Sequence, residues 1–280
     1  MDSCINVNGK IIGSDLPVIR ADNRGFRYGD GVFETIRINE GRIVLAEYHF
    51  ERFFSGLLSL QFRLPSFFTY EMLSGQVEEL CKVNKHVSSA KVRLMAFRSD
   101  DTYNGKSKEV PDYIIQTFSI LPLQQVLNDE GLRVQVFPHG RKAIDSFSNL
   151  KTNNYLLAVM AAKFAKSHQS DDCLILNSNQ RICESSIANI FCIQNGRIYT
   201  PPLSEGCVAG VSRRLILEKM NDGPYPIEEK QMDIDFVSKS DEIFLTNAIY
   251  GIRYVESIGE RQFASDITRQ IYQRLIHRLL

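Results

Sequence analysis

The stretch around which the chain is organised reads Asn149-Leu150-Lys151-Thr152-Asn153-Asn154-Tyr155-Leu156. It places one lysine, Lys151, just before an apolar segment whose nonpolar residues recur at helical spacing. The pattern predicts a helix that is buried on much of its circumference, with the polar run as its entry. Lysine is seldom buried unless it is paired, so a solvated amine is the ordinary interpretation of a lysine here. A chemical role for Lys151 therefore depends on the rest of the chain.

Length and composition limit the classes of function. The 280 residues, 44% hydrophobic and 24% charged with a net charge of zero, are enough for two domains with hydrophobic cores. We expect no membrane span and no secretory signal, because there is no apolar run of about 18 residues and no basic, apolar leader. These features predict a cytoplasmic protein with reduced cysteines. Balanced charge without a basic stripe argues against a nucleic-acid surface, and scattered histidines argue against a metal site.

The first part of the chain predicts a small α/β domain, residues 1–118. Hydrophobic patterning and turn signals predict strands at 4–7, 10–12, 32–37, 42–45, 90–98 and 112–118, and helices at 47–60 and 70–84. Three glycines between residues 25 and 31 mark backbone that must bend or approach another segment closely.

The remainder predicts a larger second domain, residues 131–280, after an interdomain loop at 119–130 where the strand pattern breaks. Strands are expected at 132–137, 173–177 and 197–200, with a last strand at 242–246, and Cys183 and Cys192 lie in segments typical of buried strands. Helices are expected after Tyr155, at 213–219 and from 265 onward. Glu184 stands out as an acid among small and apolar neighbours. Together the two parts predict an α+β fold.

Several blocks of the chain occur in an order that resembles the fold-type IV pyridoxal-phosphate enzymes. This family comprises branched-chain aminotransferases, D-amino acid aminotransferases and aminodeoxychorismate lyases. The resemblance covers nearly the whole chain and implies a small N-terminal α/β sandwich followed by a larger domain with a β-barrel-like core. The blocks are Tyr28-Gly29-Asp30-Gly31-Val32-Phe33-Glu34, His49-x-x-Arg52, Lys151-x-x-Asn154-Tyr155, Glu184-x-x-x-x-Asn189-Ile190-Phe191, Tyr199-Thr200-Pro201-Pro202, Gly210-Val211-Ser212-Arg213 and Phe244-Leu245-Thr246-Asn247.

The resemblance implies pyridoxal 5'-phosphate as cofactor and assigns a role to several residues. Lys151 matches the lysine that forms a Schiff base with the cofactor aldehyde and later moves the proton between the substrate Cα and the cofactor C4′. Glu184 matches the carboxylate that faces the pyridine nitrogen and favours the protonated ring. Tyr155 matches a tyrosine that hydrogen-bonds the phenolic oxygen of the cofactor in branched-chain enzymes.

The phosphate group would be held by donors from three segments. Arg52 matches a phosphate-binding arginine, whose guanidinium offers a fixed fork of N–H groups. Val211 and Ser212 match backbone N–H groups at a helix N-terminus, with the Ser212 hydroxyl as a further donor. Asn247 and Ala248 match a second phosphate loop. At Ala248 the aminotransferases carry a hydroxyl residue, so here only the backbone N–H group of Ala248 can contribute.

The substrate-binding candidates are Phe33, Arg93 and Arg98. Phe33 and Arg93 agree with the branched-chain pattern, in which the arginine receives the distal carboxylate of glutamate, although Lys91 replaces an expected tyrosine. D-amino acid enzymes carry an Arg-x-His pair that residues 99–106 lack. Lyases share the Asn247-Ala248 pair, but their glycine-rich segment with a second arginine after Arg98 is replaced here by Ser99-Asp100-Asp101-Thr102-Tyr103-Asn104. The sequence therefore favours a transaminase over a lyase, and places a D-amino acid transaminase third.

Two further expectations concern assembly and an alternative class of protein. In the family, a loop of the partner subunit covers the substrate pocket, so we expect a homodimer whose interface uses residues 28–33, and small-molecule amino acids and 2-oxo acids as the other partners. A binding or assembly module with a vestigial site remains the alternative from another class. Arg93 also has a structural alternative, in which it pairs with Glu34 rather than with a substrate.

Overall fold

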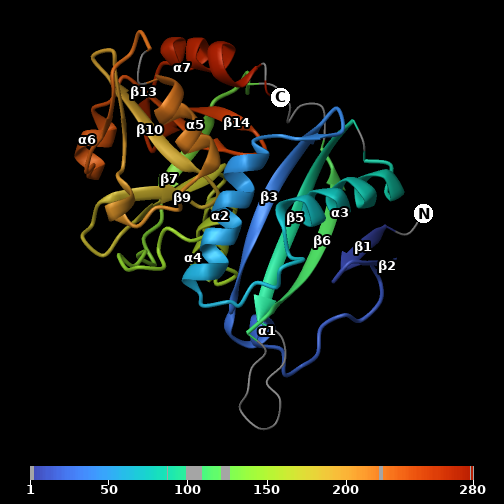
Figure 1. Ribbon diagram of the computed structural model, residues 1–280. Helices are drawn as coiled ribbons and strands as arrows, with labels where there is room; N and C mark the ends of the chain where they lie inside the picture. The colour runs from blue at the N-terminus through green and yellow to red at the C-terminus, as the bar shows by residue number, and fades with distance from the viewer. Residues whose placement is uncertain are drawn as a thin grey trace. The chain divides into compact units, whose positions relative to one another are not determined.

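The computed structural model describes residues 3–86, 88–98, 109–120, 127–220, 223–277 and 279 (Figure 1). These residues form an α+β fold with two sheets, as the sequence predicts. The chain divides into two compact units. The first unit contains residues 1–121 and 150–155, and the second contains residues 122–149 and 156–280. The predicted interdomain loop at 119–130 lies partly outside the described residues.

The first unit has a six-stranded antiparallel sheet in the order β2-β1-β6-β5-β3-β4. Its elements are β1 (Cys4–Val7), β2 (Lys10–Gly13), α1 (Arg24–Tyr28), β3 (Gly31–Asn39), β4 (Arg42–Ile43), α2 (Ala46–Ser59), α3 (Tyr70–Val83), β5 (Ser89–Arg98) and β6 (Pro111–Ser119).

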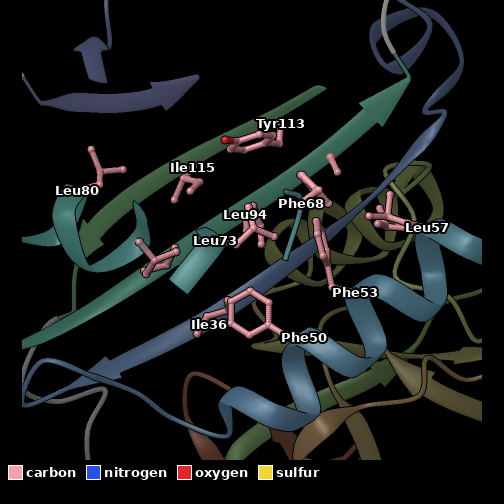
Figure 2. Close-up of a cluster of buried hydrophobic side chains, with 14 of the residues drawn as sticks. Ile36, Phe50, Phe53, Leu57, Phe68, Leu73, Leu80, Leu94, Tyr113 and Ile115 are labelled. Atoms are coloured by element: carbon pink, nitrogen blue, oxygen red, sulfur yellow. The ribbon is translucent and has the colours of Figure 1, made fainter. Parts of the chain in front are cut away.

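One face of this sheet is packed by the apolar stripes of α2 and α3. Figure 2 shows Phe50, Phe53 and Leu57 from α2 pointing toward side chains of the sheet. The sheet contributes alternate residues such as Ile36 and Leu94, which are 0% exposed. Because strand side chains alternate between faces, the neighbours of Ile36 and Leu94 in sequence lie on the other face of the sheet.

The polar stretch around Lys151 pairs with β3. The backbone N–H of Phe33 donates to the carbonyl of Lys151, and the N–H of Asn153 donates to the carbonyl of Gly31, both at 2.9 Å. Gly31 has no room for a side chain, because an added Cβ would lie 2.2 Å from the Ala96 carbonyl oxygen and 2.5 Å from Asn153 Nδ2. The close approach predicted from the glycines is confirmed here.

The second unit contains a nine-stranded sheet that curls into a half-barrel, with the order β12-β11-β10-β13-β14-β7-β8-β9 and β15 beside β14. Its elements are β7 (Leu132–Val136), α4 (Leu156–Ser167), β8 (Asp172–Leu176), β9 (Ile182–Ser185), β10 (Asn189–Gln194), β11 (Arg197–Thr200), η2 (Leu203–Glu205), α5 (Val211–Met220), β12 (Ile227–Glu229), α6 (Ile234–Ser238), β13 (Glu242–Asn247), β14 (Gly251–Ile258), β15 (Arg261–Gln262), α7 (Asp266–Ile271) and η3 (Tyr272–Ile276).

The buried strands expected around Cys183 and Cys192 are β9 and β10. The chain turns between them at residues 186–188, where the N–H of Ser185 donates to the carbonyl of Ala188 at 2.7 Å. One expectation about this unit is wrong in detail. Strand β13 is not the last strand, since Gly251, at φ 68°, lets the chain reverse into β14.

The prediction that the helix after Tyr155 is buried on much of its circumference is also wrong. In α4 only Ala161 and Ala165 are buried, whereas Leu156 is 68% exposed and Met160 45% exposed. The two alanines are one turn apart and form the stripe that packs against β8. Because apolar residues occur on several faces of this helix, their spacing in the sequence does not predict which face packs against the core.

None of the described helices has the length and apolar composition that crossing a membrane requires.

Candidate active site

Lys151 lies in the first unit against two aromatic rings. Its Nζ is 4.5 Å from the ring centroid of Phe33 and 5.3 Å from that of Tyr155. The two rings meet edge to face, with centroids 5.3 Å apart and an interplanar angle of 89°. The faces of aromatic rings attract a cation through the ring quadrupoles. These contacts position the Lys151 side chain beside Phe33 and Tyr155.

Arg93 contacts the same Phe33 ring, with its guanidinium carbon 4.6 Å from the centroid. The β3–β5 register explains this contact, because Thr35 pairs with Arg93 and Phe33 pairs with Met95, so all four side chains leave the sheet on one face. Burial lowers the pKa of Arg93 below its ordinary value.

The structural alternative for Arg93, an ion pair with Glu34, is wrong. Glu34 pairs in register with Leu94 and lies on the opposite face, toward α2. Its carboxylate accepts hydrogen bonds from Arg52 Nε at 2.7 Å, Arg52 Nη2 at 2.6 Å and His49 Nδ1 at 2.6 Å. The phosphate candidate Arg52 is therefore held by a bidentate contact to Glu34 in the first unit.

Glu34 is only 1% exposed, and its ionisation depends on these partners. Burial alone would raise the pKa of Glu34, but the charge of Arg52 and the hydrogen bonds outweigh it and lower the pKa to about 2. Burial lowers the pKa of His49, whose Nδ1 lies 2.6 Å from Glu34 Oε2. His49 Nε2 is buried without a hydrogen-bond partner among the described residues.

Replacing Glu34 by Gln should destabilise the protein by about 3–5 kcal/mol near neutral pH, because the buried guanidinium loses its counter-charge. The folded-state pKa is depressed, so the stabilisation is full above the unfolded-state value near 4.5 and is lost as pH falls toward about 2. Urea unfolding of the wild type and Glu34→Gln at several pH values measures this. The stability difference between them should shrink below pH 4.5.

The matched control is Glu47→Gln, on the same helix as Arg52 but exposed. It should change stability by less than about 0.5 kcal/mol. A stability difference for Glu34→Gln that stays constant down to pH 2.5 would show that the ionised carboxylate is not what stabilises this cluster.

Arg98, the third substrate candidate, is engaged within the first unit. Its Nε donates to Asp30 Oδ2 at 3.0 Å, its Nη2 donates to the Leu60 carbonyl at 2.6 Å, and its guanidinium carbon is 4.1 Å from the Phe62 ring centroid. Asp30 also accepts from Arg24 Nε at 3.0 Å. These contacts favour a role for Arg98 in holding the loop that contains Asp30. The neighbouring segment 99–106, whose sequence distinguishes the transaminases from the lyases of the family, lies outside the described residues.

In the second unit, Glu184 is 9% exposed and lies on β9, one residue before its end. Its Oε2 accepts the backbone N–H of Val208 at 2.7 Å, and its Oε1 contacts Lys142 Nζ. These two contacts fix the orientation of the carboxylate. Such a group can stabilise positive charge on a ring nitrogen.

Val211 and Ser212 form the first turn of α5, and both are buried. First-turn N–H groups lack acceptors within the helix, and together with the helix dipole they favour an anion. The preceding loop is positioned by Asn189, whose Nδ2 donates to the Val208 carbonyl at 2.9 Å. Gly210 fits beside it only without a side chain, because an added Cβ would lie 1.9 Å from Asn189 Oδ1.

Asn247 and Ala248 lie at the turn between β13 and β14. Asn247 Oδ1 accepts the N–H groups of Ile249 at 2.9 Å and Tyr250 at 3.0 Å. The Asn247 side chain thus shapes a turn of the kind that aspartate and asparagine commonly close. Among the predicted phosphate ligands, Ala248 contributes no side-chain donor.

Comparison with known proteins identifies the family. A model of the family described as "Amino-transferase class IV" matches residues 31–258. The chain belongs to the class IV aminotransferases. An aminodeoxychorismate lyase of Bacillus subtilis is 28% identical over 264 residues, covering 93% of this chain and 88% of the relative. A D-alanine aminotransferase of Staphylococcus haemolyticus is 24% identical over 273 residues, covering 95% and 94% respectively.

A solved structure shares the fold of this class IV aminotransferase. The branched-chain aminotransferase of Thermoproteus uzoniensis, determined with norvaline, superposes with a TM-score of 0.89 at 23% identity and covers 100% of this chain and 95% of its own. Class IV aminotransferases depend on pyridoxal phosphate. Each unit by itself contains groups of the kind that this cofactor requires. In the first unit Lys151 has an amine of the type that reacts with an aldehyde. In the second unit Glu184 has a carboxylate suited to a ring nitrogen, and the α5 N-terminus has donors suited to a phosphate.

Sequence reasoning missed Lys142 and Val208, which hold Glu184. Both lie in irregular segments, at 139–148 and 206–210, where no hydrophobic period marks a position. The backbone of Lys142 forms an isolated bridge to Asn177 and belongs to none of the strands that the structure describes. No local pattern could have indicated its contact with Glu184, which lies 42 residues away in sequence.

Proposed function

We propose that this class IV aminotransferase transfers an amino group between an amino acid of the branched-chain type and 2-oxoglutarate. Lys151 is the catalytic residue, and Arg93 receives the distal carboxylate of glutamate or 2-oxoglutarate. The bound cofactor supplies the carbonyl carbon that exchanges the amino group and a ring that accepts electrons.

One observation carries the proposal, the contact of Lys151 and Arg93 with the same ring. Because the Nζ of Lys151 and the guanidinium carbon of Arg93 lie 4.5 Å and 4.6 Å from the Phe33 centroid, they are no more than about 9 Å apart. An amino acid whose α-carbon lies at the lysine amine could reach the guanidinium with a side-chain carboxylate. Lys91 lies two residues from Arg93 on the same face of β5 and adds a second basic side chain to that face, which favours an anionic substrate.

The chemistry then follows from the residue types. The Lys151 amine would anchor the cofactor, and as a free amine it would move the proton between the substrate Cα and the cofactor C4′. Glu184, which Lys142 contacts, would face the ring nitrogen and favour its protonated form. Ser212 and the N–H groups of Val211 and Ala248 bind the phosphate, with Arg52 as a further cation. Tyr155 hydrogen-bonds the phenolic oxygen.

Aminodeoxychorismate lyase activity is the second candidate, supported by the Asn247-Ala248 pair and by the lyase among the relatives. The two reactions differ in what L-glutamate does to the enzyme. A transaminase should pass the glutamate amino group to the cofactor, with loss of the visible absorption band and release of 2-oxoglutarate. A lyase that does not transaminate leaves the spectrum unchanged. A colourless protein as purified would favour the vestigial binding module.

Arg93→Met should raise KM for 2-oxoglutarate about 10- to 100-fold and leave KM for an aliphatic amino donor within about twofold. The physical reason is the loss of a charge-assisted contact worth about 1.5–3 kcal/mol to the dicarboxylate alone. Steady-state kinetics with L-leucine and 2-oxoglutarate measure both constants.

The matched variant is Arg98→Met, whose guanidinium is engaged by Asp30 and Leu60. It should lower the melting temperature without discriminating between the substrates. Equal losses for both substrates in Arg93→Met, together with a lower melting temperature, would show that Arg93 is structural and would leave the lyase as the better proposal.

We also propose that the protein is a cytoplasmic homodimer that binds neither nucleic acid nor membranes. Tyr28 and Phe26, near the expected interface, are 54% and 74% exposed in the single chain. Light scattering under assay conditions checks the dimer, and a fully active monomer would refute it.

A further inference from the structure

A cavity of about 290 Å³ lies in the second unit, at the end of the half-barrel. It shares Asn247 with the turn proposed for the phosphate. None of the other residues assigned to cofactor or substrate lines it. Its lining residues are Leu132, Asp171, Asp172, Ile187, Ala188, Leu245, Asn247, Tyr250 and Arg253.

The β8 side of the cavity is acidic. Asp172 is 5% exposed, and its Oδ1 accepts from Cys173 N at 2.7 Å, Ser186 N at 3.1 Å and Ser186 Oγ at 2.5 Å. All these donors are neutral, and across the described residues no lysine or arginine forms an ion pair with Asp172. Burial raises the pKa of Asp172, as expected for a carboxylate without a cation. Asp171 adds a second, exposed carboxylate next to it.

The β14 side is basic. Arg253 is half-buried, and its guanidinium carbon is 5.0 Å from the ring centroid of Tyr250. Burial lowers the pKa of Arg253. In the sheet order β14-β7-β8, strand β7 separates Arg253 from Asp172, so the two charges face the cavity from different strands.

The rest of the lining is largely apolar. Leu132 lies on β7, the strand between Arg253 and Asp172, and packs against the core of the half-barrel, to which the buried Leu245 belongs. Ile187, 50% exposed, comes from the turn after β9. A cavity lined by carboxylates, a guanidinium and hydrocarbon selects a ligand with complementary groups.

We propose that this cavity is a second, non-catalytic site for a small aliphatic zwitterion, the class to which free amino acids such as leucine belong. The ligand's ammonium group would be received by Asp172 and Asp171, its carboxylate by Arg253, and its hydrocarbon portion by Leu132, Leu245 and Ile187. The ligand resembles the proposed amino donor, but the site does not depend on the reaction.

The test uses holoenzyme whose cofactor has been fixed to the protein by borohydride, so that an added amino acid cannot react. Calorimetric titration with L-leucine should show one saturable site per chain. Binding should weaken at least about tenfold in Arg253→Gln and in Asp172→Asn. The matched control Arg269→Gln removes an arginine that lies 5.2 Å from the Tyr254 ring, outside the cavity, and should bind leucine normally.

Two analogues test the zwitterion requirement. 4-Methylpentanoate lacks the ammonium group and 3-methylbutylamine lacks the carboxylate, and each should bind at least about tenfold more weakly than leucine. Absence of saturable binding, or binding unchanged in Arg253→Gln, overturns the proposal. Binding that weakens in Arg93→Met instead places leucine at the candidate active site and also overturns it. If borohydride fixes no cofactor to Lys151, the proposed function fails, while the titration still reports on the cavity.

Discussion

Lys151→Ala is expected to lower turnover by at least about 10⁴-fold and to abolish covalent attachment of the cofactor after borohydride reduction, because one amine serves as both anchor and base. The fold should survive. Lys151 is only half-buried, and its backbone pairing with Phe33 does not use its side chain. Activity assays, mass spectrometry of the reduced protein and thermal melting measure the three outcomes.

Lys230→Ala is the matched control for this substitution. Lys230 also lies against two rings, 5.0 Å from the Tyr199 centroid and 4.6 Å from the Phe236 centroid. Its removal should leave turnover and cofactor attachment unchanged. Attachment of the cofactor to any lysine other than Lys151 would refute the catalytic assignment.

Glu184→Gln should retain the cofactor but lose roughly 10³-fold in kcat, because a neutral amide cannot stabilise a protonated ring nitrogen. The amide can still accept the Val208 N–H, so the local backbone should hold. The measurements are kcat and cofactor content per chain. Lys142→Met should lower kcat less than Glu184→Gln does, since it removes only a cation that contacts Glu184 and leaves the carboxylate in place.

A second buried carboxylate of the same unit provides the comparison. Glu205 is 1% exposed and accepts from Arg181 Nε at 2.5 Å and Asn177 Nδ2 at 2.7 Å. Glu205→Gln should lower stability and leave kcat per bound cofactor unchanged. Near-normal kcat in Glu184→Gln would remove Glu184 from the mechanism.

Most elements of the fold could be predicted from local sequence. Strand β1, Cys4–Val7, and strand β11, Arg197–Thr200, have the predicted bounds, because alternating side chains between two turn signals have few other stable arrangements. Glycine-dependent features were harder to predict. Strand β14 begins at Gly251 in a left-handed conformation, and a sequence pattern does not distinguish the end of a strand from a tight reversal.

The candidate site residues were found through the order of short blocks, and the roles of those residues stay predictions. What their side chains contact depended on pairing over long sequence distances. The register between Arg93 and Thr35 decides on which face of the sheet Arg93 lies, and it places Arg93 beside Phe33 and away from Glu34. Lys142, which contacts Glu184, lies in an irregular segment, where the spacing of residues does not indicate in which direction a side chain points.

The sequence by itself determined the fold class, most element positions and the family, because local periodicity and block order are properties of the chain. Tertiary structure decided which side chains meet. Residues 150–155 belong to the first unit because they pair with β3. Most apolar residues of α4 are exposed or only partly buried. The carboxylate of Glu34 binds Arg52 and His49. The physical reason is that register, burial and ion pairing join residues far apart in sequence, and their energies depend on neighbours that a local pattern does not contain.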